Sequence, residues 1–115
     1  MTRYNTGADF EREVRKHLAY NGYEIMRSAG SKGKVDLVAF KPGQVLFVQC
    51  KHTEDGYLLP LERRELLRIS QMTTGGVALV AWLEHKPRHI VYRRLRGYGA
   101  GDSQPWAPDF LDEVR

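Results

Sequence analysis

The 115-residue sequence lacks the features that would place it among secreted, membrane or repeat proteins. It has one cysteine, Cys50, and an intrachain disulfide needs two. No apolar run is long enough to span a bilayer, and no signal-peptide pattern is present. Internal repeats and low-complexity linkers are missing too. These absences predict an intracellular, cytoplasmic protein without a disulfide framework.

What remains is the composition of one small basic domain. Hydrophobic residues make up 42% of the chain, which at this length is enough for one core and too little for two. The chain has 18 lysines and arginines against 14 acidic residues, for a net charge of +4, and 12 of the 18 are arginine. Because the guanidinium fork suits phosphate, this charge favours an anionic partner, although a merely soluble basic surface explains it equally well. We predict a single domain over 1–115, with its core over about 5–95 and a tail over 96–115.

Hydrophobic periodicity predicts the order helix, three strands, helix, two strands. Phe10, Val14 and Leu18 recur at the spacing of one helix face, which indicates a helix over about 7–20 that ends before Gly22. Apolar and β-branched runs predict strands over 23–28, 35–40, 45–50, 77–83 and 89–95. The expected fold class is α/β, a small mixed five-stranded β-sheet flanked by helices.

A second helix is predicted over 58–73, followed by Gly75 and Gly76. Its inward-facing side chains are expected to be Leu59, Leu66, Ile69 and Met72. Its solvent side is expected to carry Glu62, Arg63, Arg64, Glu65 and Arg68. From residue 96 onward the sequence is rich in glycine and indicates irregular structure, with a closing helical turn or a mobile end over 108–114.

The Lys-Pro-Gly-Gln segment at 41–44 predicts a β-hairpin whose register follows from the turn. If residue 41 faces 44, then Asp36 faces Gln49, with their Cβ atoms about 5 Å apart. Lys51 projects on the same side as Gln49, because side chains alternate along a strand. Cys50 alternates away from both, which favours a buried structural thiol over a nucleophile.

Asp36, Gln49, Lys51 and a helix carboxylate such as Glu11 suit the hydrolysis of a phosphodiester. That reaction needs charge neutralisation at the scissile phosphate and an activated water, and carboxylates holding Mg²⁺ supply both. A nearby lysine stabilises the developing charge or orients the water. Taken alone this pattern is weak, since many hairpins place an acid about a dozen residues before a lysine. Lys51 also fits a solvated strand end, and Glu11 also fits an ion pair with Arg15.

Four stretches in chain order make the pattern more specific: Gly7-Ala8-Asp9-Phe10-Glu11-Arg12-Glu13, Arg27-Ser28-Ala29-Gly30-Ser31, Val35-Asp36-Leu37-Val38-Ala39 and Val48-Gln49-Cys50-Lys51. This ordered set resembles archaeal-type Holliday junction resolvases (Hjc-like), within the PD-(D/E)XK nuclease superfamily. The likeness covers roughly residues 5–95. It implies a restriction-endonuclease-like nuclease core and a homodimer that binds four-way DNA junctions. It also implies paired nicks made with Mg²⁺, for which Mn²⁺ substitutes.

The resemblance further implies catalytic roles for individual residues. Asp36 would be the principal metal ligand, with Gln49 and Glu11 completing the metal site. Lys51 would be the catalytic lysine, and Ser31 would lie close to the scissile phosphate.

Basic residues are the candidate DNA contacts. By the resemblance, Arg12 and Arg27 contact backbone phosphates. Independently of it, the basic loop before Asp36 and the end of the last predicted strand add four further candidates: Lys32, Lys34, Arg93 and Arg94. A candidate dimer seam is formed by Leu58, Leu59 and exposed parts of the second helix.

Gln49 departs from the family pattern, which has a glutamate at this position. A glutamine offers a metal one neutral carbonyl oxygen and no charge, so the expected loss is in metal affinity rather than in fold. A native amide ligand and an engineered substitution both fit the sequence. The predicted function is a structure-selective, Mg²⁺-dependent junction endonuclease. The alternatives are a catalytically weakened junction-binding protein and a related nuclease acting on other DNA structures.

Overall fold

The computed structural model describes residues 7–27 and 35–108. Within these residues the chain forms two helices and six strands. The helices are α1 (Gly7–Tyr20) and α2 (Pro60–Ser70). The strands are β1 (Glu24–Arg27), β2 (Leu37–Lys41), β3 (Gln44–Cys50), β4 (Gly76–Glu84), β5 (His89–Leu95) and β6 (Ser103–Trp106).

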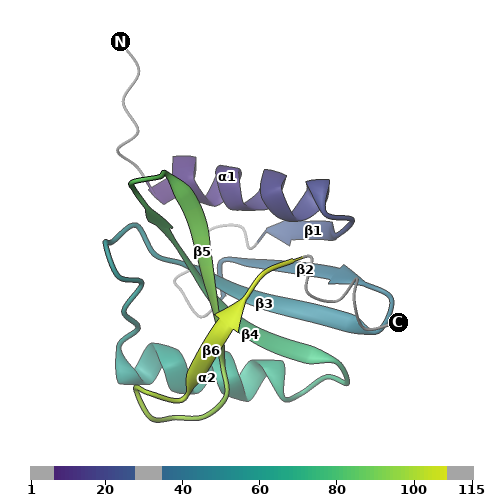
Figure 1. Ribbon diagram of the computed structural model, residues 1–115. Coiled ribbons are helices and arrows are strands. Elements are labelled where there is room, and N and C mark those ends of the chain that lie inside the picture. Colours follow the sequence, from purple (N-terminus) through teal and green to yellow (C-terminus); the bar gives the residue numbers. More distant parts are fainter. Residues whose placement is uncertain (1–6, 28–34, 109–115) are drawn as a thin grey trace.

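The strands form one mixed sheet whose spatial order, β1 to β6, follows the chain. All neighbouring pairs are antiparallel except β3 and β4, which are parallel. A parallel pair needs a crossover, and α2 provides it. Figure 1 shows α1 along one face of the sheet and α2 along the opposite face. The predicted α/β class, a mixed sheet flanked by helices, is confirmed.

The predicted strand count of five was too low, because the tail adds β6. β6 pairs antiparallel with β5, and the Trp106 ring meets the Tyr92 ring edge-on at a centroid distance of 5.3 Å. The glycine-rich loop before β6 is held by Asp102, whose Oδ2 accepts a hydrogen bond from the Gly99 amide at 3.0 Å. Pro105 lies within this strand, which an edge position tolerates. Of the closing turn expected over 108–114, all but Pro108 lies outside the described residues.

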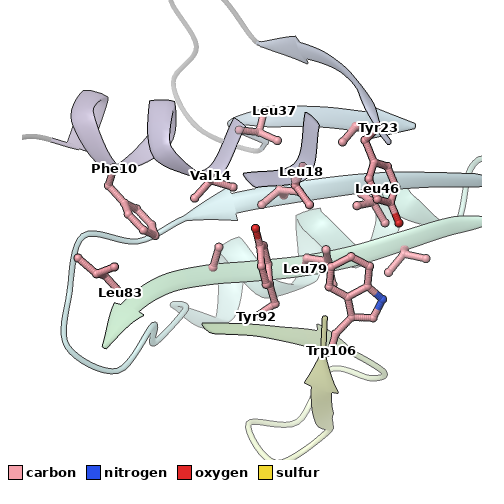
Figure 2. Close-up of a cluster of buried hydrophobic side chains, with 14 residues drawn as sticks. Phe10, Val14, Leu18, Tyr23, Leu37, Leu46, Leu79, Leu83, Tyr92 and Trp106 are labelled. Atoms are coloured by element: carbon pink, nitrogen blue, oxygen red, sulfur yellow. The ribbon is translucent and has the colours of Figure 1, made fainter. Parts of the chain in front are cut away.

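The α1 face of the sheet carries the larger core. Phe10, Val14 and Leu18 are at most 1% exposed, so the predicted helix and its buried stripe are confirmed. They pack toward Leu37 and Leu79, among other buried side chains of the sheet (Figure 2). Packing against both the sheet and each other fixes how α1 lies across the strands.

On the opposite face, α2 is shorter than predicted and its buried stripe differs. The helix begins at Pro60, a residue favoured at the first helical position, rather than at residue 58. Leu59 and Met72, predicted to face inward, are 56% and 73% exposed. Arg63, predicted to face solvent, is 8% exposed. The buried residues Arg63, Leu66, Leu67 and Ser70 follow the spacing i, i+3, i+4, i+7 of one helix face.

The predicted hairpin register is confirmed from Lys41 to Leu37. Lys41 pairs with Gln44 and Leu37 with Val48, and the Asp36 amide donates to the Val48 carbonyl at 2.9 Å. The pairing ends there, so the predicted Asp36–Gln49 pair is not formed: Asp36 lies just before β2, and its amide contacts Val48. No helix among the described residues is long and apolar enough to cross a membrane.

Candidate active site

The predicted catalytic residues lie on segments that come together where β1 ends, β2 begins and β3 ends. Asp36 lies immediately before β2, and Gln49 and Lys51 lie at the far end of β3. Glu11 lies in the second turn of α1, and Arg27 is the last residue of β1. Antiparallel pairing of β1, β2 and β3 brings the end of β1, the start of β2 and the end of β3 together.

Asp36 is held in place by the backbone of β3. The Cys50 amide donates to Asp36 Oδ2 at 2.7 Å. Because β2 begins only at Leu37, this amide has no strand partner there, and the carboxylate takes that role. Burial raises the pKa of Asp36, and the negative charges of Glu11 and Glu62 add to the rise against the opposing effects of the Cys50 amide and Lys51. A cation would therefore stabilise the ionised carboxylate.

Gln49 presents a buried oxygen without a donor. The residue is 7% exposed, and its Oε1 receives no hydrogen bond from the described part of the chain. Leaving such an acceptor unsatisfied costs about 1–3 kcal/mol, so an orphaned buried oxygen needs an explanation. An amide oxygen is a ligand that hard divalent cations accept. Asp36 and Gln49 thus fit the oxygen ligands expected for Mg²⁺.

Lys51 is held by a residue that the sequence prediction placed in solvent. Its Nζ donates to Glu62 Oε2 at 2.7 Å, with the two side chains 20% and 25% exposed. Glu62 also accepts the Leu59 amide through Oε1 at 2.8 Å, which caps α2. Burial opposes ionisation of Glu62, but the hydrogen bonds from Lys51 and Leu59 outweigh it and lower its pKa. The available signal was Pro60 at the first helical position, which puts Glu62 third, where a capping glutamate belongs.

Glu11 approaches from α1, on the other face of the sheet. Its Oε2 accepts Arg27 Nε at 3.1 Å, so its ion pair is with Arg27 rather than with Arg15. Its negative charge contributes to the raised pKa of Asp36. Arg12 lies one residue further on and donates to Asp9 at 3.0 Å.

A basic groove continues from this point along α1. It has a volume of about 390 Å³ and is lined by Arg15, Lys16, Ala19, Ile25 and Arg27. Arg15 Nε is buried and has no hydrogen-bond partner among the described residues. Sequence reasoning did not propose Arg15 and Lys16, the two groove cations of α1, as DNA contacts.

The other predicted site residues are placed as follows. Ser31, Lys32 and Lys34 lie outside the described residues. Arg93 holds β6, donating to the Ser103 hydroxyl at 2.9 Å and the Ser103 carbonyl at 3.1 Å. Arg94 points to the opposite face, and burial together with the neighbouring Arg96 lowers its pKa.

Cys50 carries no nucleophilic chemistry in this setting. Burial raises the pKa of its thiol well above the usual value, and the charges of Asp36 and Glu11 raise it further. The thiol therefore stays protonated. Within residues 7–27 and 35–108, no three His, Cys, Asp or Glu side chains gather as a metal-holding group. Because Gln49 is not an acid, a cation between Asp36 and Gln49 would be held by carboxylate and amide oxygens together.

Comparison with known proteins agrees with this geometry. The family model described as archaeal Holliday junction resolvase (Hjc) matches residues 2–96, which include α1, α2 and β1 to β5. The chain belongs to this family. An Hjc relative from Methanocaldococcus jannaschii, a crossover junction endodeoxyribonuclease, is 49% identical over 49 residues. That alignment covers 43% of this chain and 36% of the relative, so it spans about a third of the relative's length.

The family likeness extends to the fold. The structure of Hjc from Archaeoglobus fulgidus, a Holliday junction resolvase from an archaeal hyperthermophile, superposes with a TM-score of 0.62 at 25% sequence identity. The superposition covers 72% of this chain and 71% of that one. The Hjc fold is therefore shared over most of both chains.

Proposed function

We propose that the chain is a structure-selective endodeoxyribonuclease that resolves four-way DNA junctions by paired nicks, as a homodimer and with Mg²⁺. Mn²⁺ would substitute for Mg²⁺. The observation that carries the proposal is that the Cys50 amide holds the Asp36 carboxylate at the end of β3, where Gln49 and Lys51 also lie, in a chain of the Hjc family. The substrate is intracellular DNA, and the related family members are named for cutting it.

The roles of the residues follow from their contacts. Asp36 and Gln49 would hold the cation through oxygen atoms, with Glu11 nearby. When bound, Mg²⁺ neutralises charge at the scissile phosphate and lowers the pKa of a coordinated water. Lys51, held at its ammonium by Glu62, stabilises negative charge that develops on the phosphate oxygens. Cys50 contributes its backbone amide, which fixes the direction of the Asp36 carboxylate.

Junction cleavage in a substrate panel tests this function directly. The protein is incubated with a four-way junction, a flap and a linear duplex, with Mg²⁺ or Mn²⁺, and nicks are mapped on denaturing gels. We expect symmetric nicks in the junction and little cutting of the duplex. Junction binding without cleavage in either metal would favour the binding-protein alternative, which the neutral Gln49 motivates. Equal cutting of flap and junction would favour a related nuclease of different specificity.

The dimer is expected from the symmetry of the substrate and from α2. A junction has approximate two-fold symmetry, so a two-fold dimer places equivalent sites on opposing strands. Leu59, Leu61 and Met72, in and around α2, are 56%, 61% and 73% exposed, as a contact with a second copy would require. Light scattering should report twice the 13.2 kDa chain mass at micromolar concentration. Leu61→Glu should shift the mass toward the monomer, and a parent that stays monomeric on DNA would contradict the two-site mechanism.

Arg27 is expected to contribute a phosphate contact at the mouth of the site. Its side chain is 53% exposed beside Glu11 and lines the basic groove of α1. Arg27→Ala should weaken junction binding roughly tenfold, because a charge-assisted hydrogen bond is lost. It should also lower the slope of log affinity against log salt by about one.

Arg68→Ala is the matched control for this measurement. Arg68 is similarly exposed, at 48%, but it lies on α2 and pairs with Glu65 on the same helix. Fluorescence anisotropy across a salt series should give this variant the affinity and slope of the parent. If Arg27→Ala behaves like Arg68→Ala, the DNA does not pass Arg27.

A further inference from the structure

The proposed cation site carries too little negative charge for a divalent cation unless another acidic residue contributes. Asp36 carries one negative charge and Gln49 carries none, while the charge of Glu11 is paired with Arg27. A doubly charged hard cation prefers anionic oxygen ligands, and its affinity rises with their number. Another carboxylate on the Gln49 side of the sheet would restore the missing charge.

Glu62 lies on that side. Gln49 pairs with Val80 of β4, and Val80 packs in the cluster formed with Leu66 and Leu67 of α2. Alternation along β3 therefore turns Gln49 and Lys51 toward α2. Glu62 lies in the first turn of α2, and its Oε2 accepts a hydrogen bond from Lys51 Nζ at 2.7 Å.

We propose that Glu62 supplies the second carboxylate of the divalent-cation site, bringing from α2 the charge that Gln49 does not carry. The inference rests on the proposed metal-dependent function. The orphaned Oε1 of Gln49, in a residue 7% exposed, marks the position where an oxygen-seeking ligand is missing. Each oxygen of Glu62 accepts one hydrogen bond, from Leu59 and from Lys51, and each keeps a second lone pair.

Glu62 also caps its helix, so the test must separate charge from capping. A glutamine at the third helical position accepts the same backbone amide as a glutamate does. Glu62→Gln therefore removes the charge and keeps the cap. Glu65→Gln removes the same charge from the same helix, where Glu65 pairs with the exposed Arg68. Melting temperatures in EDTA should be alike for both variants.

The measurement is calorimetric titration of Mn²⁺ into the full-length protein without DNA. Glu62→Gln should weaken Mn²⁺ binding at least about tenfold, and Glu65→Gln should leave it unchanged. Gln49→Glu should tighten binding. The double variant Gln49→Glu with Glu62→Gln should return to within about threefold of the parent, because one carboxylate replaces the other. A purely structural role for Glu62 would instead lower the melting temperature of Glu62→Gln in EDTA below that of Glu65→Gln.

The outcomes separate the inference from the function on which it rests. Equal Mn²⁺ affinity of the parent and Glu62→Gln would overturn the role of Glu62, whether that shared affinity is strong or undetectable. Weaker binding without rescue by Gln49→Glu would also overturn it, leaving Glu62 as a residue that positions Lys51. If even Gln49→Glu bound no Mn²⁺, the result would contradict the proposed metal-dependent function itself.

Discussion

Asp36→Asn is expected to reduce Mg²⁺-dependent junction cleavage at least about 100-fold, because it removes the carboxylate that is proposed to hold the cation. Junction binding should stay within about threefold of the parent, since phosphate contacts come from basic side chains. Asparagine keeps an oxygen that can accept the Cys50 amide, so the end of β3 should stay in place. Single-turnover cleavage and anisotropy on the same junction check both expectations. Retained cleavage would exclude Asp36 as the metal ligand.

Asp36→Asn is expected to make the folded protein more stable, although it lowers cleavage. Burial, with the charges of Glu11 and Glu62, raises the pKa of Asp36 above its ordinary value of 3.8. A carboxyl with a raised folded-state pKa stabilises the protein below the unfolded value and loses that contribution as the pH rises through the folded value. Ionised Asp36 is therefore unfavourable at neutral pH in metal-free buffer. Asp36→Asn should raise the melting temperature there, and the gain should vanish below pH 3.8.

Gln49→Glu is expected to increase junction cleavage roughly tenfold at limiting Mg²⁺, with a smaller gain as the metal saturates the site. The substitution is nearly isosteric and adds one negative charge next to Cys50, whose amide holds Asp36. Since the side chain is 7% exposed, this charge is unfavourable without a cation, so the melting temperature in EDTA should fall. Cleavage rates across a Mg²⁺ titration, with melting curves in EDTA and in Mn²⁺, measure both effects.

Two results would contradict this expectation for Gln49. Equal cleavage by both forms at every Mg²⁺ concentration would make glutamine a fully competent ligand. A melting temperature unchanged in EDTA would indicate that residue 49 does not share a buried site with Asp36. Gln49→Asn shortens the side chain by one methylene group and adds no charge. Comparison with this variant separates the effect of charge from the effect of side-chain length.

The sequence predicted the part of the site that depends on one short turn. A two-residue turn at Pro42-Gly43 fixes the hairpin pairs from Lys41–Gln44 to Leu37–Val48, so Asp36 could be placed at the end of β3 that carries Gln49 before any coordinates were known. Phe10, Val14 and Leu18 likewise fixed the buried face of α1, because no second periodic pattern competed with them.

The contribution of α2 was missed because its start was misplaced by two residues. The run Leu58-Leu59-Pro60-Leu61 offers apolar side chains to either of two helix faces. Each residue turns a helix by about 100°, so the choice of stripe decides which side Glu62 and Arg63 face. Packing against the sheet decides which of the two helix faces is buried, and in the structure it is the face that contains Leu66. The position of Glu62 beside Lys51 follows from that choice.

β6 was missed for a different reason. A strand of four residues that contains a proline has almost no local signal, and its pairing with β5 follows a glycine-rich loop. Asp102, which accepts the Gly99 amide, is the local residue that closes this loop. Such a contact is recognisable only once both ends of the loop are placed.

The extra strand changes where this protein can be shortened. The family match stops at residue 96, yet the sheet continues to Trp106. Trimming the chain to the matched segment would strip the partner from β5 and leave its amides and carbonyls as a template for strands of other molecules. It would also uncover Tyr92, which packs edge-on against Trp106 and stacks with His17. A preparation cut at residue 96 is therefore expected to self-associate through an open sheet edge, which a mass measurement would register as oligomers unrelated to the dimer proposed through α2.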